Sequence, residues 1–128
     1  MPGTLQKAFG YQDDQMNLPV ANVAAALPYY ETVFGFRVVS RGTTPHASAI
    51  LARDAVQIGL VESGGDPTND GCAFHVQGLA ALLEEFNSRG FGKDSSAIDT
   101  EEMDGEVWNV FYAIAPDGLC YWFGERKG

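Results

Sequence analysis

The sequence contains few of the residues that most often build metal and disulfide sites. Among 128 residues there are two cysteines, Cys72 and Cys120, and two histidines, His46 and His75. Two thiols are too few for a disulfide scaffold, and their spacing does not match a zinc site. We therefore expect both cysteines to pack as free thiols, without a disulfide between them.

Positive charge and long apolar runs are also scarce. Eight Lys and Arg residues stand against 17 Asp and Glu residues, which gives a formal net charge of −9. This balance argues against nucleic-acid and anionic-membrane partners, whose affinity comes largely from basic side chains. No apolar run approaches the ~18 residues of a membrane span, and the first residues do not resemble a signal peptide. We expect a cytoplasmic protein, whose acidity suits a cationic ligand or serves solubility alone.

The common motifs of covalent catalysis and phosphate binding are missing. There is no Gly-x-Ser-x-Gly elbow and no glycine-rich phosphate loop before a helix. A cysteine nucleophile needs an adjacent base, and the sequence places none beside either thiol. The sequence therefore assigns no catalytic residue.

What the sequence does contain is a repeated pattern. Residues 20–36 and 72–91 each indicate the end of a strand, an amphipathic helix and a glycine stop, and strand-like runs follow both. We expect one domain over residues 1–128, with a first module at about 15–62, a turn-rich linker at 63–70 and a second module at about 71–125. Residues 1–13 are polar and are interpreted as an arm or a loose extension.

Each module is expected to run strand, helix and then three strands. The predicted strands are residues 15–20, 37–41, 47–52 and 56–61, then 73–76, 96–100, 107–114 and 119–123. Asn22 is a predicted helix N-cap, but Pro28 should disturb the first turn, so that a regular helix begins at about Pro28. Leu79, Leu82 and Leu83 begin the second helix. These elements predict an α+β fold, with two βαβββ modules forming curled sheets around a concave cleft.

This pattern resembles the vicinal oxygen chelate superfamily, which includes glyoxalases, bleomycin-resistance proteins and extradiol dioxygenases. Metal-dependent members take ligands from the first and last strand of each module. By this resemblance the ligand positions fall on Gln15, Gly59, Gly71 and Trp122. Glycine has no donor and an indole N–H is not a metal ligand, so we expect no metal and no cofactor.

Aromatic and acidic side chains are predicted to line the cleft instead. Strand alternation puts Trp108 and Tyr112 on one side of their strand, and it separates Trp122 from Tyr121 and Phe123, which we assign to the core. Aromatic walls bind flat or cationic ligands by stacking and cation–π attraction. An acidic run comes just before Trp108 and is interpreted as a carboxylate rim or as a solvated loop. Its members are Asp94, Asp99, Glu101, Glu102, Asp104 and Glu106.

Residues 107–125 are most similar to the bleomycin-resistance proteins, through a tryptophan region, a Pro-x-Gly hairpin and a closing Gly-Glu. The resemblance implies a homodimer that sequesters a cationic or aromatic molecule, such as a glycopeptide antibiotic, without a metal. Trp108 falls near the drug-stacking tryptophan of that family, and Ser48 falls where its stacking phenylalanine stands. The candidate ligand-binding residues are Trp108, Trp122, Tyr112, His75, Gln57, Ser48, Glu102 and Asp104.

Two other functions remain open at this point. One is a metal-dependent lyase, isomerase or dioxygenase of the same superfamily with non-standard ligands. The other is a scaffold domain that binds no small molecule. Membership of a superfamily does not by itself decide between binding and catalysis.

Overall fold

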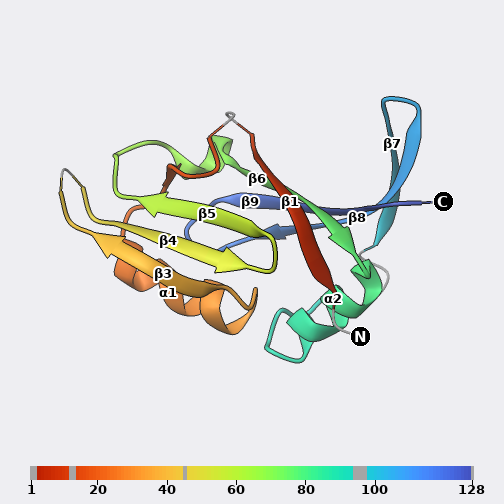
Figure 1. Cartoon of the computed structure of the whole chain (residues 1–128), viewed down its shortest axis with the longest axis horizontal. Coiled ribbons are helices and arrows are strands. Elements are labelled where there is room, and N and C mark those ends of the chain that lie inside the picture. Colours follow the sequence, from red (N-terminus) through yellow and green to blue (C-terminus); the bar gives the residue numbers. More distant parts are fainter. Residues whose placement is uncertain (1–2, 12–13, 45, 94–97, 128) are drawn as a thin grey trace.

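The protein is built from two β-sheets and two main helices (Figure 1). The computed structural model describes residues 3–11, 14–44, 46–93 and 98–127. The five-stranded sheet has the order β1 (Thr4–Gly10), β6 (Gly71–Gln77), β9 (Cys120–Arg126), β8 (Glu106–Ile114) and β7 (Asp99–Met103). The four-stranded sheet has the order β2 (Leu18–Pro19), β5 (Val56–Val61), β4 (Ser48–Arg53) and β3 (Arg37–Gly42). The helices are α1 (Val23–Thr32), α2 (Leu79–Asn87) and the short 3-10 helix η1 (Pro67–Asn69).

The two sheets repeat one strand order once β1 is set aside. In each, the first strand of the module lies parallel to the last, β2 beside β5 and β6 beside β9, and the other pairs are antiparallel. The expected α+β class with two curled sheets is confirmed. None of the described helices has the length and apolar character needed to cross a membrane.

The N-terminal segment is an ordered strand, which corrects the expectation of a loose extension for the described part of residues 1–13. β1 lies antiparallel to β6 and pairs Lys7 with His75. Leu5 is fully buried, and its backbone N–H donates to the Asp54 carboxylate at 2.9 Å. A register shift between Leu5 and Lys7 breaks the regular alternation, so the sequence pattern did not indicate a strand.

Helix α1 begins at Val23, five residues before the expected start at Pro28. The Asn22 side chain accepts a hydrogen bond from the Ala25 N–H at 2.9 Å, and the Glu62 carboxylate accepts one from the Val23 N–H at 2.9 Å. Two free donors of the first turn are thereby satisfied. The helix therefore tolerates the loss of the one backbone hydrogen bond that proline cannot donate.

A glutamate near the end of the last strand caps the second helix in the same manner. Gly78 precedes α2 in the left-handed conformation and has no side chain to serve as a cap. The Glu125 carboxylate accepts from the backbone N–H groups of Gly78 at 2.7 Å and Leu79 at 3.2 Å. Glu62 thus caps the N-terminus of α1, and Glu125 caps that of α2. The helix dipole favours a carboxylate at each position.

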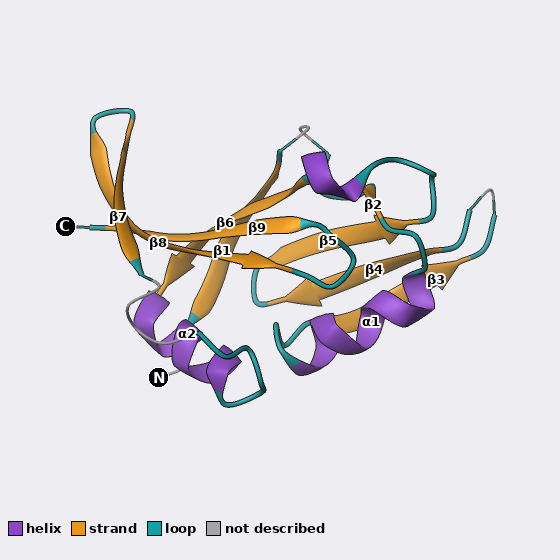
Figure 2. Ribbon diagram, turned by 180° about the vertical axis from the view of Figure 1, so that it is seen from behind, coloured by secondary structure: helices purple, strands orange, loops and turns teal. Residues whose placement is uncertain are grey.

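The core lies between the helices and the covered faces of the sheets (Figure 2). Phe34 follows α1 and its ring lies 5.1 Å from Phe86 of α2, 5.6 Å from Phe123 and 5.4 Å from Tyr121. One ring therefore joins both modules. Tyr121 and Phe123 are fully buried, which confirms their assignment to the core.

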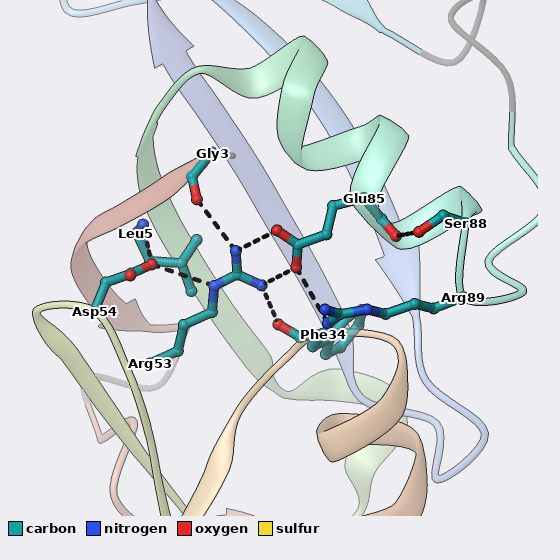
Figure 3. Close-up of polar contacts among 8 residues, drawn as sticks. All are labelled: Gly3, Leu5, Phe34, Arg53, Asp54, Glu85, Ser88 and Arg89. Atoms are coloured by element: carbon teal, nitrogen blue, oxygen red, sulfur yellow. Dashed lines mark hydrogen bonds and ion pairs between the residues drawn. The ribbon is translucent and has the colours of Figure 1, made fainter. Parts of the chain in front are cut away.

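A buried arginine also links the modules (Figure 3). Arg53 is 8% exposed and its guanidinium donates to both oxygens of Glu85 in α2, at 2.6 and 2.8 Å. It also donates to the carbonyls of Phe34 at 2.6 Å and Gly3 at 3.1 Å, and to Asp54 at 3.2 Å. All five of its N–H donors have acceptors, so the buried charge is fully compensated.

Candidate functional site

The five-stranded sheet turns one face to α2 and the core, and its other face away from the helices. We call the latter the aromatic face. Its aromatic side chains are Phe9, Tyr11, His75, Trp108, Tyr112 and Trp122. Cys72 is buried on the core side and Cys120 lies on the aromatic face, so the two free thiols point to opposite sides of the sheet, as alternation predicts.

Trp108 and Trp122 form the floor of the aromatic face. Their ring centroids are 5.6 Å apart, and the His75 ring lies 4.7 Å from that of Trp108. The Trp122 indole lies over Gly124 of its own strand. Any side chain at position 124 would clash with the ring, because an added Cβ atom would lie 2.2 Å from it. The indoles are 9% and 6% exposed, so in the single chain they form a packed floor rather than open stacking surfaces.

Two accessible tyrosine rings of this face line a hollow. Tyr11 is 41% exposed and Tyr112 is 44% exposed. The hollow between them has a volume of about 430 Å³, and we call it the Glu101 hollow. It is lined by Tyr11, Ala73, His75, Glu101, Met103, Tyr112, Cys120 and Trp122. A cavity of this size, mostly apolar with a few polar groups, is typical of a small-molecule site.

Among the described residues, Glu101 is the one carboxylate that lines this hollow. Its Oε2 accepts from the Tyr112 hydroxyl at 2.7 Å, and its Oε1 accepts from the Trp122 Nε1–H at 3.3 Å. Burial and the neighbouring Glu101 raise the pKa of Tyr112 to about 12, so the phenol stays a neutral donor. Among the described residues no cation pairs with Glu101. The hollow therefore carries an uncompensated negative charge beside aromatic rings.

Glu101 belongs to the acidic run interpreted as a carboxylate rim, but it is not among the candidate ligand-binding residues, although a signal for it exists. Asp104 and Gly105 form a two-residue turn in which both have positive φ, 52° and 79°. Such an Asp-Gly turn sets the hairpin register, and here it pairs Met103 with Glu106 and Glu101 with Trp108. Counting back from the Asp-Gly pair would therefore have placed Glu101 on the face of Trp108.

The structure does not bring the other acidic candidates to the hollow. Glu102 follows Glu101 in β7 and points to the opposite side of the strand, because side chains alternate. Asp104 lies exposed in the turn. Asp94 lies outside the described residues.

Ser48 and Gln57 belong to the other sheet. Ser48 begins β4, where it pairs with Val61 and Gly42. Gln57 is exposed in β5 and lines a separate hollow of about 280 Å³, to which Lys7 also contributes. The structure thus gathers four candidates, His75, Trp108, Tyr112 and Trp122, and separates the other four from them.

The positions that hold a metal in related folds do not suit one here. A Cβ atom added to Gly59 would lie 2.0 Å from the Met16 carbonyl oxygen, and one added to Gly71 would lie 1.8 Å from that of Cys120. At both glycines another part of the backbone therefore packs so closely that a ligand side chain has no room. Trp122 donates its N–H to Glu101. In the described parts of the chain, no three His, Cys, Asp or Glu side chains cluster closely enough to bind a metal ion.

His75 lies at the centre of the aromatic face. Its ring is 5.0 Å from Phe9 and 4.7 Å from Trp108. Burial among these rings, followed by the positive charge of Lys7, lowers the pKa of His75 below its ordinary value of 6.5. The imidazole is therefore neutral at neutral pH.

This pKa shift predicts how stability depends on pH. A histidine whose pKa falls on folding holds its proton more weakly in the native state than in the unfolded chain. Neutral His75 therefore contributes its full amount to the free energy of unfolding above pH 6.5. This contribution is lost as the pH falls through the lowered native pKa of His75. We expect urea unfolding of wild type and His75→Gln to differ by a constant amount above pH 6.5 and to converge below it. A difference that grows on acidification would contradict this.

Comparison with known proteins identifies the fold. No protein-family model matches the sequence, and no curated protein matches it significantly. Among solved structures, the bleomycin resistance determinant encoded on transposon Tn5 is 22% identical, with a TM-score of 0.65 over 88% of this chain and 96% of that one. A bleomycin-binding protein complexed with bleomycin is 22% identical, with a TM-score of 0.64 over 88% of this chain and 97% of that one.

A metal-containing protein has a similar fold. A fosfomycin resistance protein from Listeria monocytogenes, complexed with Mn(II), is 13% identical, with a TM-score of 0.60 over 89% of this chain and 91% of that one. The likeness to all three is one of fold. The protein thus has the glyoxalase/bleomycin-resistance fold, and the fold expected from the sequence resemblance is confirmed.

Proposed function

We propose that this protein binds a planar organic cation in the Glu101 hollow and sequesters it without a bound metal and without chemical change. One observation carries the proposal. Both oxygens of the Glu101 carboxylate accept hydrogen bonds from neutral groups of an aromatic pocket, and no protein cation balances its charge among the described residues.

Two physical effects then favour a flat cation over other ligands. A cation near Glu101 and the tyrosine rings gains charge attraction together with cation–π attraction of roughly 0.5–2 kcal/mol per ring. The net charge of −9 adds a long-range attraction for positive ligands. The bleomycin-binding neighbours support a binding function of this kind, while the crowded glycines at the metal positions give no support to the metal-dependent enzyme.

The test is a titration with N-methylacridinium, with bleomycin as a second probe. Both tryptophans of the chain lie on the aromatic face, so binding should quench their fluorescence. A ligand at 100 times its Kd should also raise the free energy of unfolding by about 2.7 kcal/mol. Uncharged acridine at alkaline pH is the matched control, and we expect it to bind more weakly. Equal binding of the two rings, or binding of neither, would overturn the proposal.

We also propose that two copies of the chain associate through the aromatic face. Ile114 is 68% exposed on this face and does not line the Glu101 hollow. Exposed apolar side chains beside a binding site are commonly covered by a partner, and a two-fold dimer is the commonest arrangement. Light scattering at micromolar concentration should give twice the 13.8 kDa chain mass, and a monomer would refute the dimer.

A further inference from the structure

A second hollow adjoins the Glu101 hollow on the aromatic face. It has a volume of about 530 Å³ and lies over the other end of the same strands. The two hollows share His75, and Trp108 lines the second while Trp122 lines the first. The rings of these two tryptophans are 5.6 Å apart, so the two hollows lie next to one another, and we call the pair of hollows the groove.

The charged groups of the second hollow leave one positive charge uncompensated. Arg126 pairs with Glu106 at 3.1 Å. Glu125 accepts two backbone N–H groups at the start of α2, where the helix dipole offsets its charge. Lys7, from β1, has no carboxylate within ion-pair distance in the described parts of the chain. Its field reaches into the groove, since it helps to lower the pKa of His75.

The groove therefore has opposite unpaired charges at its two ends, Glu101 and Lys7. Glu101 contacts Trp122 on β9, and only β6 separates β9 from β1, which carries Lys7. Two strand spacings put the β9 and β1 backbones about 10 Å apart. We propose that the groove takes a zwitterionic ligand whose aromatic cation lies at Glu101 and whose anionic group lies at Lys7, across β9 and β6 from the Trp122 indole.

This inference rests on the proposed function, because it extends the same site to a second end. It also predicts a preference for a zwitterion over a cation, which the net charge of the whole protein would not produce. A net charge of −9 attracts a cation more strongly than a neutral zwitterion. Preference for the zwitterion can therefore come only from a local positive group.

The experiment compares N-carboxyhexyl acridinium with its methyl ester, by quenching of tryptophan fluorescence at physiological salt. The two probes have the same ring and arm, but the acid is a zwitterion and the ester a cation. We expect wild type to bind the acid about two- to fivefold more tightly, in line with one exposed charge pair. Lys7→Gln should lose this preference and bind the ester at least as tightly as the acid, with an affinity for the ester no lower than that of wild type.

Arg41→Gln is the matched control, because it removes the same charge from an exposed position of β3 in the other sheet. It should keep the preference of wild type for the acid. Thermal unfolding checks that Lys7→Gln is folded, which is expected because the Lys7 side chain is exposed. If wild type binds the ester but prefers it to the acid, or shows no preference, the zwitterion inference fails and the proposed cation site stands. If neither probe binds, both fail.

Discussion

Replacing Arg53 by methionine is expected to lower the free energy of unfolding by about 3–5 kcal/mol, the usual effect of removing one partner of a buried ion pair. The change leaves the Glu85 carboxylate, which accepts two of the five guanidinium bonds, with only the half-exposed Arg89 at 3.3 Å as a counter-charge. It also frees the carbonyls of Phe34 and Gly3, which lie in different parts of the chain (Figure 3). Urea or thermal unfolding of the purified variant measures the loss.

Two further variants show whether the loss comes from the unpaired charge. Arg41→Met removes an exposed arginine from β3 and should change stability by less than about 0.5 kcal/mol. Arg53→Met combined with Glu85→Leu should recover part of the loss, because no charge is then left buried without a partner. A single Arg53 variant as stable as wild type would show that the arginine does not hold the modules together.

Replacing Glu101 by glutamine should weaken binding of N-methylacridinium by about ten- to a hundredfold, since an interaction with a charged group contributes ~1.5–3 kcal/mol. Glutamine has nearly the same shape and its carbonyl oxygen can still accept from Tyr112, so the fold should be unchanged. Fluorescence titration measures the affinity, and thermal unfolding checks the stability.

Glu102→Gln is the control for this second prediction. It removes the same charge from the next residue, which points to the other side of β7. Long-range attraction falls equally in both variants and is screened beyond about 8 Å at physiological salt. Only Glu101→Gln should therefore weaken binding strongly under those conditions. Equal effects of the two changes would mean that the acidic run acts through its summed charge alone.

The order of elements and their buried faces were predictable because both depend on local periodicity. The spacing of Leu79, Leu82 and Leu83 predicted α2, and the strand pattern predicted the strands that became β3, β4, β5 and β8. Alternation also predicted which residues of β9 face the core, because neighbouring side chains of a strand point to opposite sides. The predicted N-cap Asn22 is confirmed, but the regular first turn of α1 was not predictable, because Glu62, which follows β5 and lies 39 residues from Val23 in the chain, accepts from the Val23 N–H.

The sequence by itself determined the fold class, the acidic character and the division of aromatic side chains between core and open face. Only the tertiary structure decided which carboxylate joins those aromatics and where the N-terminal segment lies. Glu101 and Glu102 are chemically alike and adjacent, and hairpin register alone separates them. β1 joins the sheet through β6, more than sixty residues later in the chain, and so brings Lys7 beside His75. Contacts of such long range depend on packing and pairing, which no local pattern contains.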